Sequence, residues 1–313
     1  MSISTNSDGN SFVRTLSNVS RTSASSRTTV DSVIVPKRMP EYHYYRTLWW
    51  KEGDFNPKAN WEEATLPYKL AVGVTLEEYE KRTGEFNIRG YWEWINGDVI
   101  IYELPSEPHE VGIGVISEEI MDACRNVKWT PAQIYAFGST RTYADGSAKE
   151  ADNSFRPEKP EVPYPNGIDK KTRPWPNLVI EVAYSETIAH VTDKVKNYWL
   201  KPGHAYDAIV VKIDPVPDGQ VPNRMIAWHY CILDRRTRSM FPARTTFEFG
   251  TTDGNGAPLV FLQGARVINI ALSCLYHDVH PSIAIPQGLV PDPITIDFFL
   301  IRNAIIRALT PRV

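Results

Sequence analysis

Residues 178–183 read Leu-Val-Ile-Glu-Val-Ala, and this stretch decides the fold. A short run of mostly β-branched residues between turn-forming segments is typical of a central strand that is buried on both faces. Glu181 interrupts the run where such a strand should be most apolar. Because burying an ionised carboxylate without a partner costs several kcal/mol, we expect a cation beside Glu181.

The segments on either side of this strand alternate between strand and helix patterns. This order predicts an α/β (α+β) fold with a mixed sheet flanked by helices, extra C-terminal strands and a terminal helix. Upstream we expect a helix that begins at Thr75, a hairpin around Asn96-Gly97, a helix at 109–124, strands at 132–143 and 149–155, and a proline-studded surface loop at 157–176. Downstream we expect a helix at 188–200, strands at 208–214, 225–233 and 244–249, an apolar pattern at 259–272 and a helix at 297–309.

Composition divides the chain into three parts. Residues 1–38 are rich in Ser, Thr and Asn and are predicted to be disordered, because they offer too little apolar surface to offset the entropy of ordering. Residues 39–290 form the predicted folded domain, which opens with an aromatic cluster at 42–50. These rings most simply pack as a plug on the domain, and base stacking is the alternative. Residues 291–313 form the predicted C-terminal helix.

Bulk properties exclude several classes of protein. The net charge of the 313-residue chain is -3, so nucleic-acid binding requires a local patch rather than a polybasic surface. There is no signal-peptide core and no run near the roughly 18 apolar residues of a membrane span, so we expect a protein of the cytoplasm or nucleus without membrane contact. Cys124, Cys231 and Cys274 are far apart and lack the spacing of a disulfide framework or a metal site.

Carboxylates and a lysine occur around the central strand at spacings that bring them together. Upstream, Glu150 and Asp152 fall on one face of a strand, because side chains alternate with period two. Downstream, Lys194 and Tyr198 share one face of a helix. Asp152 and Glu181 on adjacent strands can hold a hard divalent cation, while a lysine orients a water or neutralises a phosphate. The alternative is a structural ion-pair network.

These motifs resemble those of the PD-(D/E)XK, or restriction-endonuclease-like, superfamily, and in particular its Uma branch of endonucleases. That branch has a Tyr-Glu-Leu-Ile-Asp-Gly-Glu hairpin, a histidine at the start of the first helix, a Pro-Asp strand, and a Glu-Val strand followed by a helix with Lys and Tyr. The similar features occur here in the same order: 91–98, His109, Asp152, 180–182, Lys194 with Tyr198, and the next strand at 206–214.

The resemblance implies a metal-dependent nuclease with a defined set of site residues. It implies that Asp152 and Glu181 bind Mg²⁺ or Mn²⁺, with the carbonyl oxygen of Val182 as a third ligand. It implies that Lys194 is the catalytic lysine. Glu93 matches the hairpin glutamate, which the resemblance implies to be an outer metal ligand or a group that positions water.

The sequence departs from the family pattern at three points. Ala151 stands where the family has the proline before its aspartate, and Ala183 stands where it has the strand lysine. Lys194 would therefore replace that lysine from the helix, with Lys196 as the competing candidate. The loop that separates the two metal-binding motifs is also longer than expected.

Three other groups of residues were candidates for chemistry. His277 and His280 lie three apart without a third ligand nearby, which argues against zinc. The segment 235–238, Arg-Arg-Thr-Arg, is typical of a solvated turn, and phosphate contact is the alternative. Ser185 and His190 form no nucleophile elbow, which argues against a serine hydrolase.

The sequence therefore predicts a nuclease that hydrolyses DNA phosphodiester bonds through a metal-activated water. A catalytically inactive module on the same fold, which binds nucleic acid or protein, is the alternative that the missing strand lysine motivates. A third reading, a carbohydrate-active protein, follows from nine tryptophans and many carboxylates, and it requires two opposed carboxylates across an open cleft. DNA is the predicted partner, and a homodimer is left open.

Overall fold

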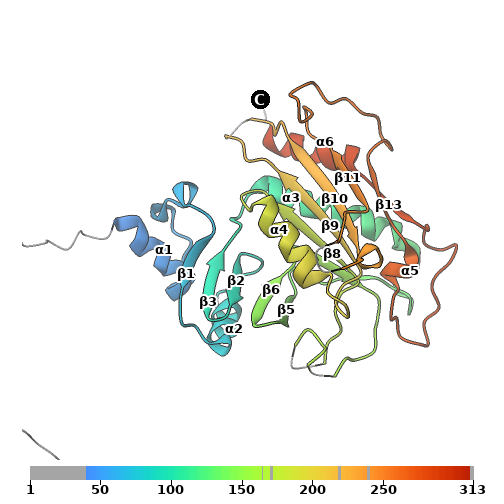
Figure 1. The fold of residues 1–313 in the computed structure, drawn as a ribbon, viewed down its shortest axis with the longest axis horizontal. Coiled ribbons are helices and arrows are strands. Elements are labelled where there is room, and N and C mark those ends of the chain that lie inside the picture. Colours follow the sequence, from blue (N-terminus) through green and yellow to red (C-terminus); the bar gives the residue numbers. More distant parts are fainter. Residues whose placement is uncertain (1–39, 164, 170–171, 218–219, 238–239, 311–313) are drawn as a thin grey trace, which may run out of the picture. The chain divides into compact units, whose positions relative to one another are not determined.

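The computed structural model describes residues 40–163, 165–169, 172–217, 220–237 and 240–310 (Figure 1). The predicted disordered segment 1–38 lies outside these residues. The helices are α1 (Glu41–Glu52), α2 (Leu76–Glu85), α3 (Glu107–Ala123), α4 (Ile188–Lys194), α5 (Leu272–Leu275) and α6 (Phe298–Leu309). Within the described residues, no helix is both long and apolar enough to span a membrane.

The strands form two larger sheets and one pair. The five-stranded sheet has the order β1 (Tyr68–Ala71), β3 (Asp98–Ile101), β2 (Trp92–Ile95), β6 (Ser147–Glu150) and β5 (Arg141–Ala144). The six-stranded sheet has the order β11 (Thr245–Glu248), β10 (Met225–Cys231), β9 (Asp207–Ile213), β8 (Leu178–Ala183), β7 (Asn153–Arg156) and β4 (Tyr135–Ala136). The pair joins β12 (Val267–Ile270) to β13 (Ile294–Asp297). The predicted mixed sheet is confirmed, because β8 runs parallel to β9 and antiparallel to β7.

Strand β8 is central and is buried along its whole length, as predicted. On one face, Ile180 and Val182 join a core with Ile116 of α3. On the other face, Val179 and Val191 of α4 belong to a second core. Helices α3 and α4 therefore cover opposite faces of the strand that carries Glu181, and Figure 1 shows α4 lying across the sheet.

The strands predicted at 132–143 and 149–155 are each broken in two, which corrects the prediction of single strands. The chain leaves the five-stranded sheet after β6 and enters the six-stranded sheet at β7. Only Ala151 and Asp152 separate these strands. Since β6 pairs with β2 and β7 pairs with β8, the backbone must turn between two sheets at this point. Asp152 thus lies at the junction of the two sheets.

Two further expectations need correction. The proline-studded loop does not lie wholly on the surface, because Ile168 and Trp175 are buried in the core under α4. Base stacking is wrong for Trp49 and Trp50, which are buried in a separate aromatic core with Trp92 of β2. Large apolar rings inside a loop or an N-terminal segment anchor it by burial, and periodicity alone does not show this.

Candidate functional site

Four of the predicted site residues come from elements that meet at the junction of the two sheets. Glu93 lies on β2, which pairs with β6, and Glu181 lies on β8, which pairs with β7. Asp152 lies between β6 and β7, and Lys194 ends α4 above β8. The fold therefore gathers residues that are up to 101 positions apart in the chain, from Glu93 to Lys194.

The cation expected beside Glu181 is Lys194. The ammonium Nζ of Lys194 lies 2.8 Å from Oε2 of Glu181, and the two side chains are only 6% and 1% exposed. The other carboxylate oxygen, Oε1, accepts a hydrogen bond from Nε1 of Trp199 at 2.5 Å. Trp199 ends a π-helical turn, Val195–Trp199, that continues α4. Both the lysine and the tryptophan that hold Glu181 thus come from one helical segment.

Glu93 shares the same lysine. Its Oε1 lies 3.6 Å from Nζ of Lys194, and its Oε2 accepts a hydrogen bond from Lys149 of β6. Nε2 of His190 lies 3.7 Å from the same Oε2. Burial alone would raise the pKa of Glu93, but the positive charges of Lys149 and Lys194, with His190, outweigh it and lower the pKa.

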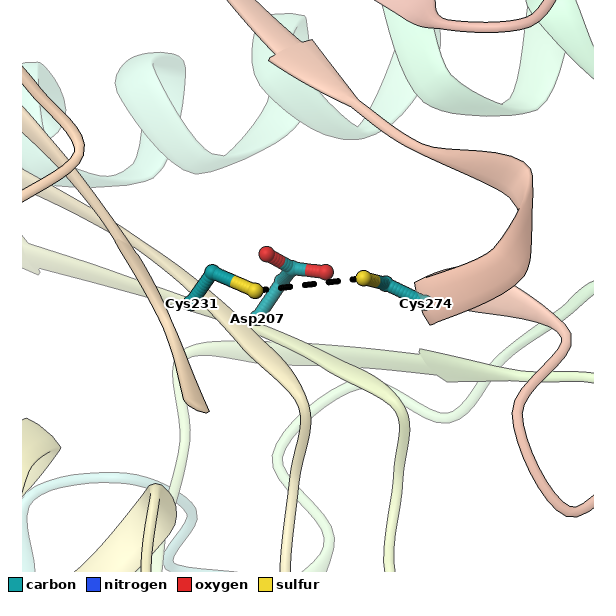
Figure 2. A group of neighbouring side chains, drawn as sticks. All are labelled: Asp207, Cys231 and Cys274. Carbon is teal, nitrogen blue, oxygen red and sulfur yellow. Dashed lines mark hydrogen bonds between the residues drawn. The ribbon is translucent and has the colours of Figure 1, made fainter. Parts of the chain in front are cut away.

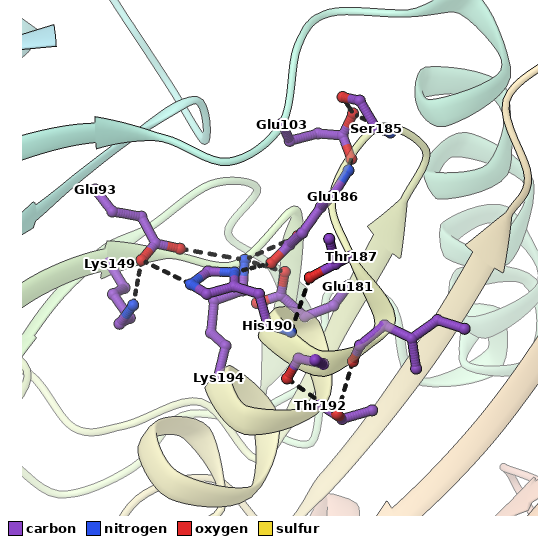
Figure 3. Close-up of polar contacts among 12 residues, drawn as sticks. Glu93, Glu103, Lys149, Glu181, Ser185, Glu186, Thr187, His190, Thr192 and Lys194 are labelled. Carbon is purple, nitrogen blue, oxygen red and sulfur yellow. Dashed lines mark hydrogen bonds and ion pairs between the residues drawn. The ribbon is translucent and has the colours of Figure 1, made fainter. Parts of the chain in front are cut away.

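The structure adds two charged residues that the sequence analysis did not assign. Glu186 bonds through Oε1 to Nδ1 of His190, and its Oε2 lies 3.8 Å from Nζ of Lys194. His190 stacks on Tyr102, with ring centroids 3.4 Å apart. The spacing of four residues from Glu186 to His190 across a helix start was the available signal, since such residues are neighbours on a helix. The contacts of Glu186 with His190 and Lys194 are drawn in Figure 3.

Glu103 fixes the loop between β8 and α4. Its carboxylate accepts hydrogen bonds from the backbone N–H groups of Tyr184, Ser185 and Glu186 at 2.8 to 2.9 Å. The hydroxyl of Ser185 also donates to Glu103. Since this loop sets where α4 begins, Glu103 positions both Glu186 and the helix that carries Lys194. Ser185 is bound to Glu103 rather than to His190, which agrees with the absence of a serine hydrolase elbow.

We call the group Glu93, Lys149, Glu181, Glu186, His190 and Lys194 the charged cluster. Its three carboxylates face two ammonium groups and one imidazole. Burial raises the pKa of Glu181 well above its ordinary value, against the lowering effect of Lys194, and the charge of Asp152 raises it further. Burial would lower the pKa of Lys194, but the charge of Glu181, followed by those of Glu186 and Glu93, raises it. The carboxylates of the cluster thus favour the charged form of Lys194, whereas burial opposes the charged form of Glu181.

Asp152 is held from two sides. Its Oδ2 accepts a hydrogen bond from the backbone N–H of Val182 at 2.6 Å and lies 3.4 Å from Nε2 of His109. Because the N–H and C=O of one strand residue point to the same side, the Val182 carbonyl faces the side of β8 on which Asp152 lies. Burial would lower the pKa of His109, but the charge of the nearby Asp152 carboxylate outweighs it and raises the pKa well above its ordinary value.

A surface cavity gives access to the Asp152 side of this region. A cavity of about 490 Å³ is lined by Asp152, His109 and Arg89. A second cavity of about 940 Å³ shares Arg89 and Ser139 with the first, and Arg141 also lines it. Asp152 and His109 therefore form the cavity-facing side of the region, whereas Glu181 and Lys194 lie behind them in the interior.

Several other candidates have different partners. Lys196, the competing lysine, lies over the ring of Tyr230 at 5.0 Å, away from the charged cluster. Glu150 pairs with Arg141 at 2.6 Å. Nη1 of Arg235 donates to the carbonyls of Lys196 and Leu200 and so ends the α4 segment, which gives it a structural role.

The remaining candidates also find partners close by. The hydroxyl of Tyr198 bonds to that of Thr142 at 2.9 Å. His277 stacks on Tyr206, and Nδ1 of His280 contacts the hydroxyl of Ser282.

No family model matches the sequence, and no curated protein matches it. Among solved structures, the chain is similar to a protein from Anabaena variabilis described as a candidate nuclease belonging to DUF820. The two share 18% sequence identity, and the match covers 74% of this chain and 99% of that chain with a TM-score of 0.38. The assignment of the site therefore rests on the geometry of this chain.

Proposed function

We propose that the chain is a metal-dependent nuclease whose site lies at the junction of the two sheets. The observation that carries this proposal is the Lys194 ammonium group, 2.8 Å from Glu181 on the strand beside Asp152. A carboxylate of the central strand, a second carboxylate just before the neighbouring strand and a lysine over the first suit attack on a phosphodiester. The proposed metal ligands are Asp152, Glu181 and the Val182 carbonyl.

The donor set suits a hard cation such as Mg²⁺ or Mn²⁺, because it consists of oxygen atoms. Oδ1 of Asp152 accepts no hydrogen bond from the described residues, and Oε2 of Glu181 is held by Lys194 through an ion pair. Each carboxylate thus has one oxygen that accepts no hydrogen bond from a backbone N–H or an aromatic ring N–H, and at Glu181 that oxygen is the one paired with Lys194. A metal ion bound there would lower the pKa of a bound water and neutralise charge on the phosphate.

The chain's own residues supply positioning and charge. Lys194 would place a positive charge at the phosphate, and Glu181 and Glu93 hold its ammonium group in the interior. Nε1 of Trp199 fixes the rotation of the Glu181 carboxylate. His109 sits against Asp152, and the raised pKa of its imidazole places a positive charge beside that carboxylate. These roles need a nucleophilic water that reaches Asp152 from the cavity.

A catalytically inactive module on the same fold is the second candidate, and one observation favours it. Both carboxylates of the charged cluster that the sequence predicted to act, Glu93 and Glu181, are already bound to lysines in the interior. A structural ion-pair network of this kind needs no metal. The two functions differ in whether a divalent cation binds.

Calorimetric titration with Mn²⁺ and a cleavage assay together separate the two candidates. We expect Mn²⁺ to bind the wild-type protein and Mg²⁺ or Mn²⁺ to support cleavage of DNA, with no cleavage in the presence of a chelator. RNA of the same sequence, tested in parallel, defines the substrate. Absence of both metal binding and cleavage would favour the inactive module, and metal-independent cleavage would contradict the proposed site.

A further inference from the structure

Three potential metal ligands meet in the interior at the other end of the central strands. Asp207 begins β9 and pairs in register with Cys231, which ends β10. Cys274 comes from α5, which packs over these strand ends (Figure 2). One ligand atom of each residue lies within 4.8 Å of the others, and all three residues are buried. Because β8 and β9 are parallel and Leu178 is the partner of Asp207, this group lies at the opposite end of β8 from Ala183.

The carboxylate of Asp207 has one oxygen without a partner. Oδ1 lies 2.7 Å from Nε2 of His229, and both side chains are 1% exposed. Oδ2 is buried and has no hydrogen-bond partner among the described residues. Leaving a buried carboxylate oxygen unsatisfied is costly, so an oxygen without a partner beside two sulfur atoms is suited to bind a cation.

We propose that Asp207, Cys231 and Cys274 bind a thiophilic divalent cation, with Zn²⁺ as the best fit. The two Sγ atoms lie 3.8 Å apart. Two thiolates that bind zinc tetrahedrally at about 2.3 Å are separated by about 3.8 Å, which is the spacing found here. A carboxylate oxygen completes three protein ligands, which leaves the fourth position to a water molecule.

The residues around the three ligands support this assignment. His229 holds Asp207 through Oδ1, which leaves Oδ2 for an ion, the arrangement by which an outer imidazole orients a ligating carboxylate. Nδ2 of Asn177 donates to the carbonyl of Cys274 at 3.2 Å and so fixes α5 against the start of β8. The ion would join β9, β10 and α5. This proposal does not depend on the proposed nuclease site.

The site was hidden from sequence analysis for a simple reason. Cys231 and Cys274 are 43 positions apart and come from a strand end and a short helix. Zinc motifs are recognised by close pairs of ligands in the sequence, and Asp207, Cys231 and Cys274 contain no such pair. The spacing of the cysteines in the sequence therefore gave no sign that Cys231 and Cys274 lie beside Asp207.

The test is the metal content of the purified full-length protein, measured by mass spectrometry. After saturation with Zn²⁺ and removal of loosely held ions with a weak chelator, we expect about one zinc ion per chain. Cys231→Ser and Asp207→Asn should lower that content at least about tenfold. Cys124→Ser is the matched control, because Cys124 is also buried but lies outside this group, and it should retain the ion.

Titration of the wild-type protein with Co²⁺ gives a readout that does not depend on variants that fold. Cobalt bound by two thiolates produces a strong sulfur-to-metal charge-transfer absorption, which we expect to saturate at one equivalent and to be displaced by Zn²⁺. Absence of this absorption in the reduced protein would overturn the proposal.

Discussion

The Nζ of Lys194 lies 2.8 Å from Oε2 of Glu181, and both side chains are buried between α4 and the central strand β8. The pair explains how a charged residue persists in the most apolar strand of the fold. It also ties the helix to the strand at the junction where Asp152 lies. Loss of this pair should therefore change two properties that can be measured independently, the free energy of unfolding and the rate of cleavage.

Removal of Lys194 should destabilise the fold. Lys194→Met leaves Glu181 buried without its cation, and loss of one partner of a buried ion pair typically costs about 3–5 kcal/mol. Chemical denaturation measures this as a lower midpoint at an unchanged slope. The double variant with Glu181→Gln should recover part of the loss, because no carboxylate is then left unpaired.

Lys196→Met is the matched control, since Lys196 lies on the same segment but over Tyr230. It should change the free energy of unfolding by far less than Lys194→Met does. Equal losses in the two variants would show that the pairing with Glu181 carries no special weight.

Acid should destabilise the protein through His204. Burial lowers the pKa of His204 from 6.5 to about 4, against the raising effect of its bond to the Tyr198 carbonyl. As the pH falls below 6.5, the unfolded chain binds a proton that the folded chain binds only near pH 4. Stability therefore falls between these values, by up to about 3 kcal/mol at 1.36 kcal/mol for each pKa unit.

Urea denaturation of wild type and His204→Gln between pH 7.5 and 4.5 checks this dependence. Gln keeps a donor for the Tyr198 carbonyl but does not titrate, so the variant should lose less stability on acidification. Parallel curves for the two proteins would mean that other groups cause the acid loss.

Arg89 should contribute to nucleic-acid binding. Its side chain is 48% exposed, its guanidinium lies 4.0 Å from Glu150, and it lines both surface cavities, one of which Asp152 also lines. Arg89→Ala should weaken binding of DNA and lower the slope of log affinity against log salt by about 0.9, the value for one phosphate contact. Fluorescence anisotropy at several salt concentrations measures this slope.

Arg125→Ala is the control for that experiment. Arg125 is 71% exposed, pairs with Asp122 and lines neither cavity. It should leave the salt slope unchanged. A slope that falls equally in both variants would place the contact surface elsewhere.

Much of the fold follows from periodicity in the sequence. The buried run at 178–183, the hairpin at Asn96-Gly97 and the helix capped by Thr75 are all found where the pattern predicts them. Each is encoded within about ten residues, so local preference and tertiary structure agree. The break at Ala151 could not be predicted in this way, because it arises from pairing with two different sheets.

The candidate site, too, could be predicted from the sequence only in part. The need for a cation beside Glu181 follows from its place in an apolar strand, and Lys194 meets that need. His190 and Glu186 were not predicted, since their importance depends on the approach of Glu93 from another sheet. The spacing of Glu186 and His190 is the local signal, but the contact of His190 with Glu93 leaves no mark on the local sequence.

The rate of DNA cleavage by Asp152→Asn, with Mn²⁺ present, tests the central claim most directly. Asp152 is the proposed metal ligand that faces the cavity, and the substitution keeps its size while it removes the charge. Asp193→Asn is the matched control, because Asp193 lies on α4 with its side chain exposed and bonded to Asn197. We predict cleavage by the wild type and by Asp193→Asn, and a loss of at least about 100-fold in Asp152→Asn. Cleavage by Asp152→Asn at the wild-type rate would contradict the account.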